Sequence, residues 1–118
     1  MKSFIILLSF CAFSTCSGSI SSNQVDLIVN SIWKIEGGAK TKWPYGIKSI
    51  KTDNPRRICE NTVRNQYKRW SNWGKTNDFL QSLQIRYCPI GAPDDPKNLN
   101  SNWLRNLRKE LGKDFIVK

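Results

Sequence analysis

The chain has 118 residues, a formal net charge of +10 and no histidine. This length suits a single domain, and the missing histidine excludes Ser-His-Asp and Cys-His catalysis and removes the commonest zinc ligand. Any acid–base chemistry must therefore fall to a carboxyl group, a tyrosine or a lysine. We expect no metal and no cofactor, and the strong positive charge predicts anionic partners.

Residues 1–19 have the pattern of a secretory signal peptide. Lys2 supplies a positive start, residues 4–13 form an apolar run, and small or polar residues follow. The run is shorter than the about 20 apolar residues that a transmembrane helix needs. We therefore predict an exported protein, periplasmic or extracellular, without a transmembrane segment, whose domain covers residues 20–118. An uncleaved N-terminal anchor is the alternative.

The first helix of this domain is predicted to begin after Ser21. Ser21 and Gln24 fit a capping box, and apolar residues recur after them at helical spacing. Gly37 and Gly38 are expected to end the helix, because glycine readily adopts the left-handed conformation. Glu36 then lies in the last turn, where its charge opposes the negative end of the helix dipole.

A short strand and three further helices are expected downstream. Residues 47–51 alternate in polarity after a turn-rich stretch, which favours a strand or one arm of a hairpin. The second helix is predicted to be capped at residue 53 or 54, with Pro55 in its first position. The third begins near Thr76 and the fourth near Ser101. The sequence thus predicts a small α+β fold that is mostly α.

Cys59 and Cys88 are the cysteines that remain once the signal peptide is removed. An even number of cysteines in an exported chain favours a disulfide. Closing this loop would stabilise the fold by about 3 to 4 kcal/mol in the chain-entropy model. We therefore predict a Cys59–Cys88 disulfide, with two free buried thiols as the alternative.

Glu36 is the carboxylate that local structure does not explain. The other two glutamates, Glu60 and Glu110, have cationic neighbours at helical pairing distance. Glu36 has large apolar neighbours in the sequence, among them Trp33 and Trp43. Apolar surroundings raise the pKa of a glutamate, so that it can donate a proton near neutral pH. Glu36 is therefore the candidate general acid.

Four short motifs follow one another along the chain: EGGAK at residues 36–40, PYGI at 44–47, RYCP at 86–89 and NSNW at 100–103. The ordered set resembles a group of small lysozyme-like proteins from phages and bacteria. The stretch from the glutamate onwards also resembles the active-site signature of lytic transglycosylases and goose-type lysozymes. In those families the helix-borne Glu is followed by Gly-Leu-Met-Gln-Ile, and Ser49 here stands at the position of the Gln.

The resemblance implies roles for individual residues. Glu36 would be the catalytic acid and then the base, and Tyr87 would orient Glu36 or an acetamido group of the substrate. The substrate-binding residues would be Tyr45, Gly46, Ile47, Ser49 and Tyr87. A plain core position is the alternative for Tyr87, and it is also the favoured reading for Trp103. Trp43 is either a platform for stacking sugars or part of the core.

The function implied is that of a lysozyme-like muramidase, a glycosidase that cleaves the glycan strand of peptidoglycan. A lytic transglycosylase with a single catalytic Glu fits best, because Asp53, the only carboxylate just after the glycine motif, is better explained as a helix cap. Hydrolysis by water is the near alternative. The expected partners are glycan strands and anionic cell-wall polymers, with no specific nucleic acid, and the protein is expected to be a monomer. The alternative class is a secreted basic protein that binds glycans or polyanions without catalysis.

Overall fold

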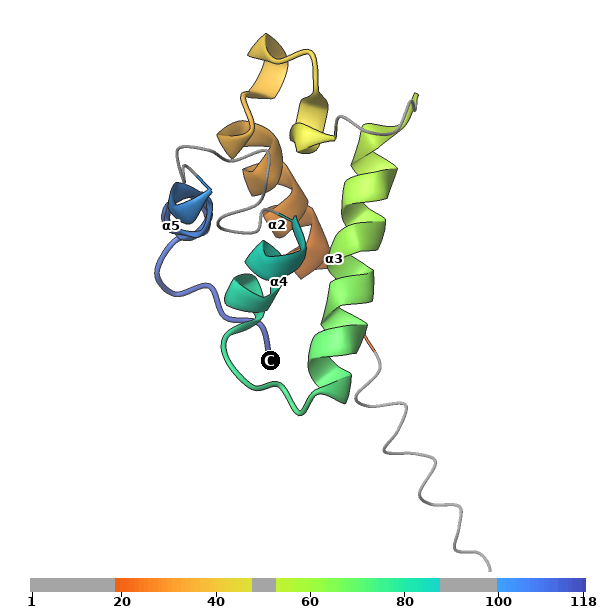
Figure 1. Ribbon diagram of the computed structural model, residues 1–118, viewed down its shortest axis with the longest axis vertical. Helices are drawn as coiled ribbons and strands as arrows, with labels where there is room; N and C mark the ends of the chain where they lie inside the picture. The colour runs from red at the N-terminus through yellow and green to blue at the C-terminus, as the bar shows by residue number, and fades with distance from the viewer. Residues whose placement is uncertain (1–18, 48–52, 88–99) are drawn as a thin grey trace, which may run out of the picture.

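The computed structural model describes residues 19–47, 53–87 and 100–118, and these residues form a bundle of helices (Figure 1). Helix α2 contacts both α3 and α5, and α4 contacts the same two helices. The two short 3₁₀ helices, η2 and η3, lie at the end of the molecule where α2 ends. The elements are α2 (Ser22–Ile35), η2 (Gly38–Lys40), η3 (Pro44–Gly46), α3 (Pro55–Asn72), α4 (Phe79–Tyr87) and α5 (Ser101–Leu111).

The predicted α+β class is wrong, since the described ranges contain helices and no strand. Of the predicted strand, residues 48–51 lie outside the described residues. Just before it, Pro44–Gly46 curls into η3, in which Tyr45 has φ 61° and Gly46 has φ +72°. A strand needs extended backbone, and these angles bend the chain instead. The helices bury their apolar faces against one another, so the described fold is all-helical.

The helix starts are set by local capping, as the sequence predicts. The Ser21 hydroxyl accepts a hydrogen bond from the backbone N–H of Gln24 at 3.1 Å. The Asn54 side chain accepts one from the backbone N–H of Arg57 at 3.1 Å, with Pro55 in the first position of α3. Both caps are confirmed, because each satisfies a backbone donor that has no partner within its helix.

Helix α4 begins at Phe79 rather than near Thr76, where the sequence predicts it. Lys75 and Asn77 have positive φ angles of 55° and 67°, which a right-handed helix cannot contain. The turn is fixed from α3, where the indole N–H of Trp70 donates to the carbonyl oxygens of Thr76 and Asn77 at 3.1 and 3.2 Å. A tertiary contact therefore delays the helix start.

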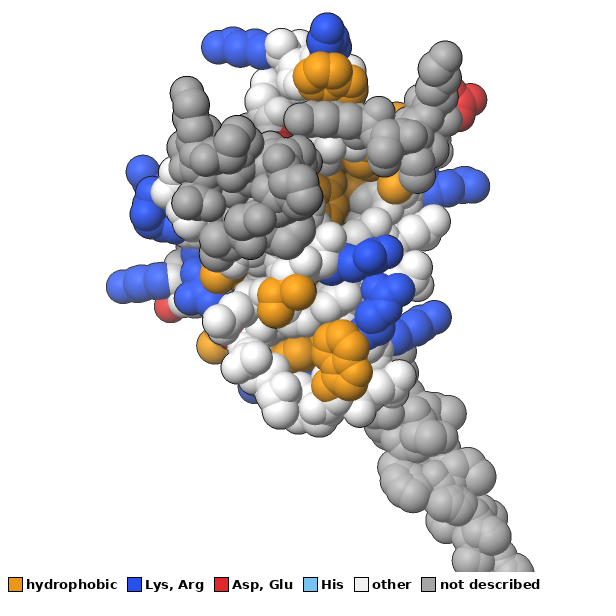
Figure 2. Space-filling model, in the orientation of Figure 1, with side chains coloured by type: hydrophobic (Ala, Val, Ile, Leu, Met, Phe, Trp, Pro, Cys, Tyr) orange, Lys and Arg blue, Asp and Glu red, His pale blue; other side chains and the backbone are white. Residues whose placement is uncertain are grey.

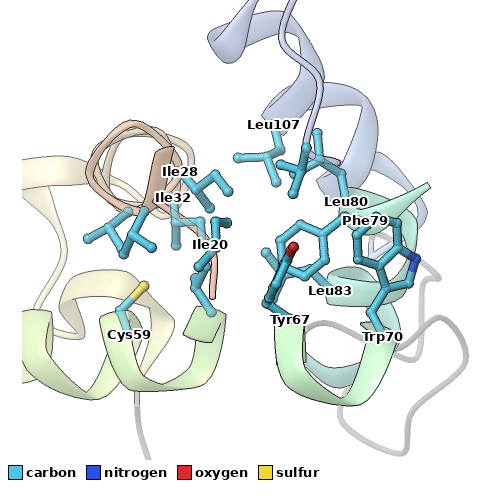
Figure 3. Packing of buried hydrophobic residues seen from close by; sticks show 14 of the residues in the cluster. Ile20, Ile28, Ile32, Cys59, Tyr67, Trp70, Phe79, Leu80, Leu83 and Leu107 are labelled. Carbon is cyan, nitrogen blue, oxygen red and sulfur yellow. The ribbon is translucent and has the colours of Figure 1, made fainter. Parts of the chain in front are cut away.

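The core lies between the four longer helices (Figure 3). Three aromatic rings from α3 and α4 pack on one another within it, with centroid separations of 5.4 to 5.8 Å. Burying a large apolar side chain contributes roughly 1.5–3 kcal/mol. The buried side chains of this core are therefore the main source of the domain's stability. The fully buried side chains are Phe79, Ile28, Ile32, Leu83, Leu107, Val25, Val29, Val63 and Cys59.

The predicted Cys59–Cys88 disulfide is wrong, because Cys59 is a buried free thiol. Cys88 lies outside the described residues. Helical periodicity places Cys59 on the same face of α3 as Val63 and Tyr67, and its side chain has 0% exposure. Figure 3 shows its sulfur directed into the core, towards Ile32. Cys59 therefore acts as a small apolar core residue, as in the alternative of free buried thiols.

The last residues of the chain are held against the bundle. Val117 is buried, and the Tyr67 hydroxyl donates to the carbonyl oxygen of Lys118 at 2.8 Å. The Gln24 side-chain amide donates to the carbonyl oxygen of Ile116, also at 2.8 Å. These contacts tie the tail to α2 and α3, which closes that end of the core.

Candidate functional site

Glu36 lies at the point where α2 stops, as the sequence predicts. Its backbone N–H completes the helix by donating to the carbonyl oxygen of Ile32 at 3.0 Å. Gly37 and Gly38 then adopt φ angles of +112° and +57° and turn the chain away from the helix axis. A half-buried carboxyl group is thereby placed at a helix end, beside a chain that folds back over it.

Gly46 is the part of the returning chain that meets this carboxyl group. A Cβ atom added at Gly46 would lie 2.8 Å from Cδ of Glu36 and 2.9 and 3.0 Å from its two oxygens. Real side chains do not approach so closely, so any residue other than glycine would displace the carboxyl group. The absence of a side chain therefore lets the η3 backbone pack directly against Glu36.

Trp103 contacts the same carboxyl group from α5. Its indole Nε1–H donates a hydrogen bond to Oε2 of Glu36 at 3.0 Å. Trp103 itself is 6% exposed, which confirms its predicted place in the core. The indole is a donor and never an acceptor, so it orients the carboxyl group and marks Oε2 as the accepting oxygen. Sequence reasoning placed Trp103 in the core but missed this contact.

Tyr87, at the end of α4, supports both neighbours of Glu36. Its ring stacks on the indole of Trp103, with centroids 5.4 Å apart and planes at 20°. Its hydroxyl donates to the carbonyl oxygen of Tyr45 in η3 and lies 3.5 Å from the sulfur of Cys59. Burial raises the pKa of Tyr87 well above its usual value, so the hydroxyl stays protonated and remains a donor. Tyr87 thus lies beside the two residues that contact the Glu36 region, Trp103 and Tyr45. Its predicted role in binding substrate stays a prediction.

The side chain of Tyr45, a predicted substrate-binding residue, is buried and held by contacts within the protein. Its ring is 8% exposed, and its φ of 61° is unusual for a bulky residue. Backbone strain of this kind costs of order 1–3 kcal/mol and persists only where surrounding contacts enforce it. One such contact is the Tyr87 hydroxyl. Another is Arg56, whose pKa is raised chiefly by hydrogen bonding to the Tyr45 side chain.

Arg56 is a residue of this region that the sequence analysis did not single out. From α3 its guanidinium donates to Oδ1 of Asn30 at 2.8 Å and to Oε2 of Glu60 at 3.1 Å. Together with Tyr45, these partners come from α2, α3 and η3. Arg56 therefore joins the three elements around Glu36. In the sequence, the residue type and spacing of Arg56 suggested only a helical ion pair with Glu60. Nothing in the sequence indicated its contacts with α2 and η3.

The other residues predicted to contact substrate differ in how far they are exposed. Ile47 is half-buried and packs against the core, while Ser49 lies outside the described residues. Trp43 is 41% exposed, and Nζ of Lys42 lies 4.8 Å from the centroid of its ring. The core alternative for Trp43 is therefore wrong. An exposed indole two residues before Tyr45 leaves its predicted use as a sugar platform open.

The surface around these elements carries lysines and arginines (Figure 2). Among the described residues, no group of His, Cys, Asp and Glu could hold a metal ion. Within the same ranges, no helix has the length and apolar character that crossing a bilayer would require.

Comparison with known proteins adds no relative to this picture: no protein-family model, curated protein or solved structure matches the chain. The resemblance to lysozyme-like proteins therefore rests on the four short motifs. Three residues from those motifs, Glu36, Gly46 and Trp103, meet in space although they come from three different elements.

Proposed function

We propose that this protein cleaves the glycan strands of peptidoglycan, with Glu36 as its single catalytic carboxyl group. The observation that carries the proposal is the packing of the Glu36 carboxyl group between the backbone of Gly46 and the indole N–H of Trp103. A half-buried carboxyl group whose orientation is fixed in this way can give a proton to a bound substrate, and take one back, at a fixed position. The resemblance of the surrounding motifs to lytic transglycosylases supplies the substrate class.

In this proposal the two carboxyl oxygens of Glu36 have different tasks. Because Oε2 accepts from the indole, the proton of the acid form belongs on Oε1. Oε1–H would donate to the glycosidic oxygen as the bond to the sugar breaks. The carboxylate left behind is stabilised on Oε2 by the same indole N–H, which needs no rearrangement.

The second half of the reaction returns the proton to Glu36. In the transglycosylase reaction the substrate's acetamido group stabilises the sugar cation. The 6-hydroxyl of the same sugar then attacks the anomeric carbon and gives its proton to the Glu36 carboxylate. The product carries a 1,6-anhydro ring, and the carboxyl group regains its starting form. No water is consumed, so one protein carboxyl group suffices.

Three other described carboxylates have partners that suit a mechanism with one carboxyl group, whereas Asp53 is exposed and is not the cap of α3, which is Asn54. Two-carboxylate glycosidases need a second acid about 5 to 9.5 Å from the first. Asp26 and Glu60 pair with Arg56, and Glu110 pairs with Lys34 at 3.1 Å. These acids are engaged in ion pairs on the surface, which is their ordinary structural role.

The test compares Glu36→Gln with Glu110→Gln in clearing a suspension of purified cell wall. Both changes remove one carboxylate from a glutamate, but only the first removes the proposed acid. Glu36→Gln should lose about 10²- to 10⁴-fold in rate, with its melting temperature and wall binding retained. Glu110→Gln should stay active. Equal activity of Glu36→Gln and wild type would overturn the assignment.

Mass spectrometry of the products separates the two chemical outcomes. Anhydro sugar ends support the transglycosylase, whereas reducing ends would show hydrolysis. A wild-type protein that binds the wall but never clears it would favour the alternative class, a basic glycan-binding protein without catalysis. The exposed indole of Trp43 beside Lys42 would then be the first place to look for its contact with glycan.

A further inference from the structure

A second concave site lies away from Glu36, between the C-terminal half of α5 and the start of α4. It is a cavity of about 490 Å³. Four of its lining side chains are cationic and one is acidic; they are Arg105, Arg108, Lys109, Lys113 and Asp78. Cations near the end of a helix are common, because they offset the helix dipole. Their convergence on one cavity goes beyond that, since Arg105 lies in the middle of α5.

The two arginines of the cavity are held in place before any ligand arrives. The Arg108 guanidinium binds Oδ2 of Asp78 at 2.6 Å, and the Arg105 guanidinium donates to Oδ1 of Asn102 at 2.5 Å. A guanidinium fixed by one partner keeps further N–H groups for another. Its planar fork matches the oxygens of a phosphate group, and less entropy is lost when the ligand binds.

The rest of the lining favours a phosphate group over a nucleobase. Leu80 and Phe115 form the apolar part of the cavity, but Leu80 is buried and Phe115 packs against the core. Single-stranded nucleic acid is usually held by several exposed aromatic rings on which successive bases stack, whereas the lining of this cavity has one aromatic ring, that of Phe115, which is half-buried. Lys109 and Lys113 are exposed and add mobile positive charge at its edge.

We propose that this cavity binds the phosphate groups of a phosphodiester-linked cell-wall polymer. Only the choice of the wall as the source rests on the proposed function; the phosphate chemistry comes from the cavity. Trp103 and Arg108 share α5, so the cavity lies roughly 8 Å along the helix axis from the Trp103 position. A polymer held there keeps the protein on the wall while glycan strands enter and leave the Glu36 site.

The test measures binding of a short poly(glycerol phosphate) chain by fluorescence anisotropy, without any turnover. Lys109→Gln/Lys113→Gln should weaken binding about tenfold, because each lysine loses a charge-assisted contact. The control is Arg64→Gln/Lys68→Gln, which removes the same charge from α3 and should bind nearly as wild type. Equal weakening of the two double variants would mean that overall charge alone attracts the polymer, and would overturn the proposal.

Three further probes identify the ligand and keep this proposal separate from the first. A poly-glutamate chain of equal charge should bind more weakly, and equal binding would refute a phosphate site. Tighter binding of a single-stranded oligonucleotide, or of phosphatidylglycerol vesicles, with the same sensitivity to Lys109 and Lys113, would replace the wall polymer with that ligand. Glu36→Gln should bind poly(glycerol phosphate) as wild type does, so failure of catalysis leaves this result intact.

Discussion

Replacing Gly46 by alanine tests the contact on which the candidate site depends. The new Cβ atom would lie 2.8 Å from Cδ of Glu36, too close for the two groups to keep their positions. The side chain of Glu36 is the more flexible partner, so it should move and give up the hydrogen bond from Trp103. Gly46→Ala therefore displaces the proposed acid without altering its chemistry.

Gly74→Ala is the matched control for backbone strain. Gly46 and Gly74 have φ angles of +72° and +81°, but a Cβ atom at Gly74 would meet nothing within 4 Å. An alanine in the left-handed region costs about 1–2 kcal/mol at either position. The lost hydrogen bond to the half-buried carboxyl group of Glu36 should add about 1–3 kcal/mol in Gly46→Ala alone.

The assays are thermal unfolding and clearance of purified cell wall. Both variants should lose stability, with a melting temperature lower by about 4–8 °C for each kcal/mol in a domain of this size. Only Gly46→Ala should also lose about 10²-fold or more in rate, because a displaced acid no longer reaches the glycosidic oxygen. The reasoning is refuted if the two variants lose equal stability and retain equal activity.

Trp103→Phe keeps a ring against Tyr87 but removes the donor to Glu36, so turnover should fall about tenfold while wall binding is retained; unchanged turnover would contradict the role of the indole. Burial raises the pKa of Cys59 from 9.0 to about 11. Because the folded state keeps the proton longer than the unfolded one, stability is full below pH 9 and should fall by about 3 kcal/mol as the pH rises to 11. Urea unfolding between pH 9 and 11 measures this loss of stability. If the stability of the wild type depended on pH no more than that of Cys59→Ala, the prediction would be contradicted. A reducing agent should leave the melting temperature unchanged, since Cys59 is a free thiol; a drop of several degrees would point to a disulfide after all.

The helix boundaries were largely determined by the sequence itself, because they depend on groups a few residues apart. Ser21 and Asn54 cap their helices through hydrogen bonds to backbone N–H groups three residues on. Gly37 and Gly38 end α2 through their own backbone angles. The position of Glu36 at a helix end follows from these local effects, so sequence reasoning could select it as the candidate acid.

The partners of Glu36 were decided by the tertiary structure alone. Its donor, Trp103, is 67 residues away in the chain, and the hydroxyl of Tyr87 meets the carbonyl of Tyr45 across 42 residues. Such contacts depend on how helices pack, and the periodicity of one helix shows which face is buried but not what it will face. The same reason explains the wrong disulfide. Cysteine count suggested a partner for Cys59, whereas the packing of α3 turned its thiol into the core, where it is a buried free thiol.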